Sequence, residues 1–318
     1  MKYYAGIDFG GTGIKVGIID ENGKILIKDS FDTDPAKSGV EIAKHIAECT
    51  RKVMKDSGLP MEDILGVGIG SPGLLNPETG ELKVVVNVQN LNGVHITKIL
   101  SEELGKPAFL DNDVNVMSLG EFYYGAGKGL KHVIALTLGT GVGGGIILNG
   151  EIYRGASFTA GELGHVSISR DGKYCPCGNA GCLERYVGRD GIIERFMISK
   201  NKGVKTNIDD HLDNGKITPK AIAMAAESGD ALAIKVLEET GEILGSVLAT
   251  LVNALNPEAI IIGGGVANAG ELILGPARRT MYKLAYSIPA DVVKVVKAKL
   301  GNDAGLVGAA SLVVANLK

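Results

Sequence analysis

Residues 3–19 read YYAGIDFGGTGIKVGII, and this stretch decides the fold. An apolar run over residues 3–9 meets a glycine-rich turn, which leads into a second apolar run over residues 14–19. Both runs have the composition of β-strands, and the turn Asn22-Gly23 that follows is typical of a hairpin returning as a third strand over residues 24–28. The chain therefore opens with antiparallel strands whose first turn is rich in glycine.

The same pattern occurs a second time near the middle of the chain. Residues 11–19, GTGIKVGII, align without gaps on residues 139–147, GTGVGGGII, with six of nine positions identical. The second copy also follows an apolar run, over residues 133–138, and precedes an Asn-Gly turn, Asn149-Gly150. We infer two related halves, each opening with a β-hairpin.

Strands and helices alternate in the rest of the chain, which indicates an α/β fold. We predict a loop-rich tract over residues 154–188. The helices are expected over residues 40–57, 96–104, 114–124, 189–200, 218–227, 230–254, 272–285 and 306–316, and further strands over 64–69, 107–110, 259–262 and 292–296.

Composition excludes several classes of protein. The 318 residues contain 46 glycines and no Trp, and 33 basic against 36 acidic residues give a net charge of −3. This balance argues against a nucleic-acid partner, and the lack of an apolar run of ~18 residues argues against a membrane partner. The N-terminal residues lack the features of a signal peptide, so we expect a cytoplasmic protein. The length fits two domains.

The paired glycine turns are candidate phosphate sites, because a turn without Cβ atoms lets backbone N–H groups converge on an anion. Thr12 and Thr140 add hydroxyl donors, Lys15 adds a positive charge, and Asp8 would hold Mg²⁺ through water. The alternative is a pair of ordinary tight turns. The G-x-G-x-x-G match at residues 139–144 runs into a strand and not the helix of a dinucleotide site, and no P-loop motif occurs in the sequence.

Three of the four cysteines are packed together, as Cys175, Cys177 and Cys182, and His165 lies upstream of them. Three thiolates and one imidazole make a complete tetrahedral zinc set, and a site with four protein ligands is structural and not catalytic. Disulfides are the rival interpretation, disfavoured in a cytosolic chain and by the odd number of clustered cysteines. Cys49 lies in an expected helix and is assigned to core packing.

Carboxylates gather at two further places. Asp111 and Asp113 follow the expected strand over residues 107–110, where they would serve as helix caps or provide a general base beside a ligand. Glu162 and Glu184 flank the zinc-ligand candidates, so a zinc ion would fix both in one region. Carboxylates held in this way accept hydrogen bonds from several hydroxyls, which suits a sugar.

Taken together, these motifs resemble the ROK family of repressors, open-reading-frame proteins and sugar kinases, within the actin-like ATPase superfamily. Residues 6–15 resemble the first phosphate motif of that superfamily, residues 138–145 the second, and residues 262–266 the adenosine motif. Residues 161–165 with 175–184 are similar to the ROK E-x-G-H and C-x-C-G-x-x-G-C-x-E signature. The resemblance implies a two-lobed actin-like ATPase (ribonuclease H-like) fold with duplicated β-hairpin phosphate motifs and a structural zinc loop. The expected lobes are residues 1–112 with 303–318, and residues 113–302.

The resemblance implies ATP-dependent phosphorylation of a hexose at its 6-hydroxyl, as in the first step of glycolysis, with a glucose kinase as the nearest type. Asp113 would be the base that takes the hydroxyl proton. The implied sugar-binding residues are Asn90, Asn112, Glu162, His165 and Glu184. The implied nucleotide and phosphate residues are Asp8, Gly10, Gly11, Thr12, Lys15, Gly139, Thr140, Gly141, Gly264 and Gly265, with Mg²⁺ as cofactor. In this family the histidine binds zinc through one nitrogen and can face the sugar through the other.

Alternatives remain open within and outside the kinases. The base motif of the family usually reads Glu-Asn-Asp-Ala-Asn, whereas Asp111 and Val114 stand here in place of Glu and Ala. Rival substrates are fructose, N-acetylmannosamine and N-acetylglucosamine, and polyphosphate is a rival donor. A sugar-responsive transcription regulator is disfavoured, because ROK repressors carry a winged helix-turn-helix ahead of the first phosphate motif, which here begins at residue 6. The resemblance also implies a homodimer or higher homo-oligomer.

Overall fold

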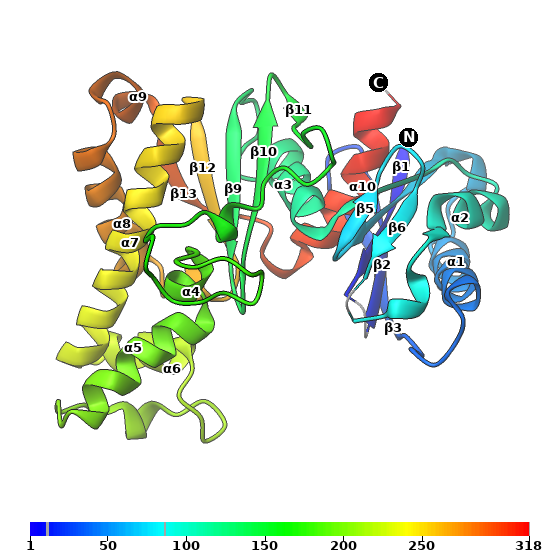
Figure 1. Ribbon diagram of the computed structural model, residues 1–318. Coiled ribbons are helices and arrows are strands. Elements are labelled where there is room, and N and C mark those ends of the chain that lie inside the picture. Colours follow the sequence, from blue (N-terminus) through cyan, green and yellow to red (C-terminus); the bar gives the residue numbers. More distant parts are fainter. Residues whose placement is uncertain (11–12, 86, 318) are drawn as a thin grey trace. The chain divides into compact units, whose positions relative to one another are not determined.

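The computed structural model describes residues 1–10, 13–85 and 87–317 and divides into two compact units (Figure 1). Unit 1 comprises Met1–Gly129, Ile152–Ala160 and Lys299–Lys318, and unit 2 comprises Leu130–Glu151 and Gly161–Ala298. The expected boundary after residue 112 differs from this division. Residues 113–129 belong to unit 1, because the helix that begins at Asp113 packs along the C-terminal helix of the same unit.

Unit 1 is built on a mixed sheet with the strand order β3-β2-β1-β4-β8. Strand β1 pairs antiparallel with β2 and parallel with β4, which pairs parallel with β8. Helices α1 and α2 cover one face, and α3 and α10 pack against the other (Figure 1). The elements are β1 (Tyr3–Phe9), β2 (Gly13–Asp20), β3 (Ile25–Asp32), α1 (Gly39–Asp56), β4 (Ile64–Ser71), α2 (Ile96–Leu104), β8 (Ala108–Asn112), α3 (Asp113–Tyr124) and α10 (Ala304–Asn316).

Close packing of α10 accounts for several glycines that the phosphate motifs do not. A Cβ atom on Gly68 of β4 would lie 1.8 Å from the backbone oxygen of Ala309, and one on Gly308 would lie 1.7 Å from that of Val116 in α3. Neither distance is possible for real atoms, so only glycine lets the backbones approach this closely. Part of the glycine surplus therefore serves the core of unit 1.

A small sheet in unit 1 was not expected from the sequence. Its strands β5 (Leu74–Asn76), β6 (Glu81–Val84) and β7 (Val94–His95) pair in chain order. Each strand is short and lacks a sustained apolar alternation. Leu75 in β5 and Leu82 in β6 are the buried residues of those two strands. The period-2 signal needs more residues than these strands contain.

Unit 2 carries a second mixed sheet with the order β11-β10-β9-β12-β13. Strands β9 and β10 pair antiparallel, and β12 runs parallel to both β9 and β13. The long helices α7 and α8 lie side by side and contribute to the core of this unit (Figure 1). The elements are β9 (Val133–Leu138), β10 (Val142–Leu148), β11 (Glu151–Ile152), α4 (Glu184–Val187), α5 (Arg189–Asn201), α6 (Pro219–Glu227), α7 (Ala231–Leu255), β12 (Ala259–Gly263), α8 (Glu271–Leu284), α9 (Ser287–Val292) and β13 (Lys294–Lys297).

Both expected Asn-Gly turns connect antiparallel strands. Gly23 has a φ of 80°, and Asn149 and Gly150 have φ values of 55° and 83°. In the second turn, two successive residues with positive φ make the type I′ geometry that joins strands with a right-handed twist, whereas in the first turn only Gly23 has a positive φ. In the described part of the chain, no helix has both the length and the apolarity that crossing a membrane requires.

Candidate active site

The first hairpin of unit 1 places a carboxylate opposite an ammonium group. Asp8 and Lys15 are partners in the β1–β2 register, and Lys15 Nζ lies 3.6 Å from Asp8 Oδ2. Gly305 at the start of α10 makes room for this carboxylate, since a Cβ atom there would lie 2.9 Å from Asp8 Oδ2. The N–H of Gly10 donates to the carbonyl oxygen of Gly13 across the turn. The predicted phosphate residues Gly11 and Thr12 lie outside the described residues.

The predicted base lies at the junction of β8 and α3. Asn112 is the N-cap of α3, and its Oδ1 accepts a hydrogen bond from the N–H of Val114 at 2.9 Å. Asp113 Oδ1 accepts from the same N–H, also at 2.9 Å. Both side chains are half-buried. Asn112 therefore acts as a helix cap, as its residue type predicts, while Asp113 stands in the first turn of the helix.

Asn90 lies elsewhere in unit 1, at an exposed position on the single turn Gln89–Leu91. Its amide nitrogen donates to the carbonyl oxygens of Pro35 and Lys37, at 3.1 and 2.8 Å. These bonds fasten the segment that leads into α1. A contact of Asn90 with a substrate consequently falls to its side-chain oxygen.

In unit 2 the glycine turn between β9 and β10 borders two hollows that share Gly139 and Thr140. The larger is a cavity of about 650 Å³ that also reaches Gly265. Its further lining residues are Arg189, Asp213, Thr218, Pro219, Lys220, Ala223, Met224, Glu227, Val266, Asn268 and Ala269. Gly139, Thr140 and Gly265, which the sequence assigned to a nucleotide, thus meet in one cavity.

The smaller hollow, of about 350 Å³, holds three of the five residues that the family resemblance assigned to a sugar, whereas Asn90 and Asn112 belong to unit 1. Glu162, His165 and Glu184 line it together with Gly141 and Gly264. Glu184 Oε2 accepts a hydrogen bond of 3.0 Å from the N–H of Val142. His165 Nε2 lies 3.9 Å from Glu162 Oε2. A ring of carboxylate and imidazole groups beside a glycine turn is suited to binding several hydroxyl groups next to a phosphate.

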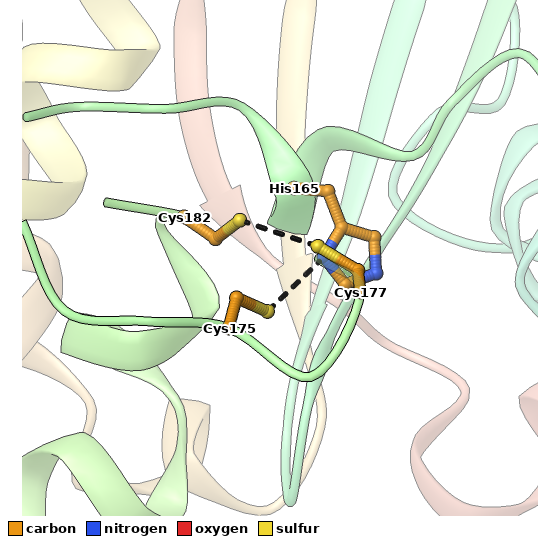
Figure 2. A group of neighbouring side chains, drawn as sticks. All are labelled: His165, Cys175, Cys177 and Cys182. Atoms are coloured by element: carbon orange, nitrogen blue, oxygen red, sulfur yellow. Dashed lines mark hydrogen bonds between the residues drawn. The ribbon is translucent and has the colours of Figure 1, made fainter. Parts of the chain in front are cut away.

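The cysteine loop forms a candidate metal site beside this hollow. The ligand atoms of His165, Cys175, Cys177 and Cys182 all lie within 4.8 Å of one another, and their side chains converge (Figure 2). Cys177 Sγ lies 3.6 Å from Cys182 Sγ, and Cys175 Sγ lies 3.8 Å from His165 Nδ1. A zinc tetrahedron with Zn–S bonds of about 2.3 Å has edges of about 3.8 Å, so the four residues fit this metal.

The histidine and one cysteine are prepared for this role. His165 presents Nδ1 to the sulfurs and Nε2 to Glu162, so its two nitrogens face different groups. A hydrogen bond from the backbone of Asn179 lowers the pKa of the Cys177 thiol, which favours the thiolate that binds metals. The cysteines are free of disulfides.

Several residues of the larger cavity were not expected from the sequence. Arg189 donates its backbone N–H to the Gly139 carbonyl oxygen, and its Nη1 lies 3.4 Å from Thr140 Oγ1. Thr218 caps α6, and the Thr-Pro pair at its start predicts that helix. Helix α6 brings Lys220 and Glu227 to the cavity only through tertiary packing, which no local signal reveals.

The comparisons with known proteins agree on one family. The profile of the ROK family matches residues 4–316. A glucokinase from Halalkalibacterium halodurans is 38% identical over 317 residues, covering 98% of this chain and 95% of that protein. A glucokinase from Thermotoga maritima is 37% identical over 312 residues, covering 97% and 96%.

A solved structure gives the same result. The ROK family glucokinase from Streptomyces griseus, in complex with glucose and AMPPNP, superposes with a TM-score of 0.77 at 33% identity, covering 98% of both chains. The family match across nearly the whole chain agrees with the mixed sheets, the glycine turns and the His-Cys₃ cluster described above. This chain belongs to the ROK family.

Proposed function

We propose that the protein transfers the γ-phosphoryl group of ATP to the 6-hydroxyl of glucose. One observation carries the proposal: in unit 2 the same glycine turn, Gly139–Gly141, borders a nucleotide-sized cavity and a hollow lined by Glu162, His165 and Glu184. Relatives named glucokinase, and a relative in complex with glucose and AMPPNP, support this choice of sugar and donor.

The larger cavity of unit 2 would receive the nucleotide. Gly264 and Gly265 follow β12. Gly264 has a φ of 87°, and its backbone lies so close to that of Leu138 in β9 that a Cβ atom would collide with it. Gly141 would present its N–H group to the phosphates, and Thr140 would add its hydroxyl. Gly139 would line the site, while its own N–H donates to the carbonyl oxygen of Gly141 and holds the turn. Gly139, Thr140 and Gly265 line this cavity, whereas Gly141 and Gly264 line the smaller hollow beside it.

In unit 1, Asp8 and Lys15 would act on the phosphates of the donor. Lys15 supplies positive charge, and Asp8 would hold Mg²⁺ through water. The family resemblance assigns Gly10, Gly11 and Thr12 to the same phosphates. A bound Mg²⁺ would neutralise charge on the phosphates during transfer.

Asp113 would deprotonate the sugar. As the 6-oxygen attacks the γ-phosphorus, its bond to phosphorus forms and the bond between that phosphorus and the leaving oxygen of ADP breaks. The hydroxyl proton passes to the Asp113 carboxylate, which the first turn of α3 holds in place. Asn112, Glu162, His165, Glu184 and the side-chain oxygen of Asn90 would bind the sugar hydroxyls.

His165, Cys175, Cys177 and Cys182 would hold a structural zinc ion. A closed four-ligand site contributes folding free energy and leaves no position for a substrate. Its effect here would be to fix the loop between Glu162 and Glu184, which carry sugar-binding oxygens at its two ends. Cytoplasmic location stays a prediction from the N-terminal sequence, and assembly as a homodimer stays a prediction from the family resemblance.

A coupled assay of ADP release over a panel of hexoses tests the proposal. We expect glucose to give the highest kcat/KM with ATP, ahead of fructose, mannose, N-acetylmannosamine and N-acetylglucosamine. Replacing ATP by polyphosphate should abolish turnover. A higher kcat/KM for another sugar, or efficient use of polyphosphate, would reject the assigned substrate or donor.

A further inference from the structure

Asp111 is a buried carboxylate directly before the Asn112–Asp113 turn, and its two oxygens have different partners. The residue is 1% exposed. Oδ1 accepts from the N–H of Asn112 at 2.8 Å and from Nδ2 of the buried Asn115 at 2.9 Å. Oδ2 accepts a hydrogen bond from Nε of Arg154 and pairs with its Nη2, each at 2.8 Å. One oxygen thus binds the turn and the first helical turn of α3, and the other binds a guanidinium.

Arg154 reaches this carboxylate from a separate segment of unit 1, Ile152–Ala160. The N–H of Ala160 donates to the carbonyl oxygen of Arg154 at 3.0 Å, which closes a short loop on that residue. Within the loop, Ser157 Oγ and Thr159 Oγ1 lie 2.7 Å apart, and Phe158 has a φ of 63°. A bulky residue in the left-handed region persists only where its surroundings hold it, so the loop is held in a defined conformation.

We propose that Arg154 is a positioning residue for phosphoryl transfer, which acts through Asp111 to fix the direction of the Asp113 carboxylate. The proposal rests on the proposed function, because it assigns Asp113 as the base. The Asp111 side chain cannot rotate while the guanidinium binds one oxygen and Asn112 and Asn115 bind the other. Asp113 follows Asn112 in the chain, so a change in the conformation of this turn displaces the Asp113 carboxylate.

The geometry favours arginine at this position. A guanidinium offers two N–H groups in a rigid fork, whereas a lysine ammonium is a point charge on a flexible stem. A buried carboxylate that loses its cation is strongly unfavourable and adopts a new partner or conformation. The family resemblance alone does not single out Arg154, which lies outside the motifs that carry it.

The test compares Arg154→Met, Arg154→Lys and the double variant D111N/R154M with the wild type. We expect Arg154→Met to lower kcat for glucose about 10- to 100-fold, the range for reacting groups that are misplaced by about 1 Å. The dissociation constant for AMPPNP should stay unchanged, because the nucleotide residues lie on other elements. Arg154→Lys should give an intermediate kcat.

The double variant separates positioning from stability. It removes the uncompensated charge together with the arginine, so its melting temperature should return toward the wild-type value while kcat stays low. If kcat recovers with the melting temperature, or if folded Arg154→Met keeps wild-type kcat, the positioning role is wrong. Should Arg154→Met fail to fold, the double variant and Arg154→Lys decide by the same criterion.

Arg51→Met provides the matched control. Arg51 also belongs to unit 1 and pairs with a carboxylate, Glu103, at 3.2 Å, and its side chain is 34% exposed against 27% for Arg154. Wild-type kcat is expected for this variant. Wild-type enzyme without any turnover of glucose would instead reject the proposed function, so the two failures are distinguishable.

Discussion

Glu184 Oε2 accepts a hydrogen bond from the backbone N–H of Val142, at 3.0 Å. The bond joins the residue two positions after Cys182 to the glycine turn that borders the larger cavity of unit 2. Gly141 must be glycine for this contact, because a Cβ atom there would lie 2.4 Å from the same oxygen. Order in the cysteine loop is therefore connected through Glu184 to the glycine turn at residues 139–141, and not only to the hollow that Glu162, His165 and Glu184 line.

Loss of the metal should consequently weaken the binding of both glucose and the ATP analogue. We expect Cys177→Ser to lose bound zinc, measured by elemental analysis of the purified protein, because the site keeps three of its four ligands. The affinity for glucose and for AMPPNP, measured by calorimetry, should each fall about tenfold, which corresponds to ~1.4 kcal/mol.

Cys49→Ser is the control for the thiol itself. Cys49 is buried in α1, and its Sγ contacts His45 and no residue of the cysteine cluster. This variant should keep its zinc and both affinities. If metal-free but folded Cys177→Ser protein binds glucose and AMPPNP with wild-type affinity, the metal does not support ligand binding.

Replacing the base should stop the chemistry and spare sugar binding. We expect Asp113→Asn to lower kcat about 10²- to 10⁴-fold, the usual contribution of a general base. The dissociation constant for glucose should change little, because the amide keeps an oxygen that accepts from the Val114 N–H. Stopped assays measure kcat and calorimetry measures binding.

Asp56→Asn, at an exposed position on α1, is the control and should behave as wild type. Near-normal turnover of Asp113→Asn would show that Asp113 is not the general base.

Two neighbouring glycines of α10 should respond differently to alanine. A Cβ atom on Gly305 meets the end of the Asp8 side chain, which can shift, whereas one on Gly308 meets the backbone of Val116. Gly305→Ala should fold and lose about tenfold in kcat/KM for ATP, because the Asp8 carboxylate is displaced. Gly308→Ala should lose about 3 kcal/mol or more of stability, since overpacking against a backbone is poorly relieved.

Thermal unfolding and steady-state kinetics separate these two effects. The interpretation fails for Asp8 if Gly305→Ala keeps its wild-type kcat/KM for ATP. It fails for the core if Gly308→Ala melts at the wild-type temperature.

The stability of the folded protein should depend on pH through the carboxylate of Asp230. Burial alone would raise its pKa, but hydrogen bonds from Thr206, from the N–H of Ala233 at the start of α7 and from the N–H of Asn207 lower the pKa below the usual value. A lowered folded-state pKa stabilises the protein above the unfolded value of about 3.9, and this contribution is lost as the pH falls through the folded value.

Asp230→Asn should therefore be about 1 kcal/mol less stable than the wild type at pH 7, because the charged acceptor is removed. Urea unfolding of both proteins should show this difference constant above about pH 5 and shrinking below about pH 4. A difference that stays constant down to pH 3.5, or grows, would show that the carboxylate charge is not what stabilises the folded state.

Most of the fold could be predicted from local sequence, because its long elements have clear periodicity and punctuation. The strand over residues 3–9 and the helix over residues 96–104 begin and end at the expected residues, and Gly105 ends that helix with a φ of 64°. The helix expected over residues 40–57 begins one residue earlier, with a complete capping box between Ser38 and Glu41.

What could not be predicted depends on contacts between distant segments. Arg154 stands in a loop without a motif, and only the fold brings it to Asp111. Gly68 and Gly308 lie inside the strand expected over residues 64–69 and the helix expected over residues 306–316, and no local signal shows that backbone packing around α10 requires glycine at both positions. Helix α9 was missed because Ser287–Val292 is short and contains Pro289, which weakens a helical pattern.

The most direct measurement is the identity of the product formed from glucose and ATP. We predict that ³¹P NMR of the reaction will show stoichiometric glucose 6-phosphate and ADP, with no inorganic phosphate in excess of a glucose-free control, and no product with Asp113→Asn. Phosphate on another hydroxyl, hydrolysis of ATP without sugar phosphate, or an unchanged spectrum with the wild-type protein would contradict the account.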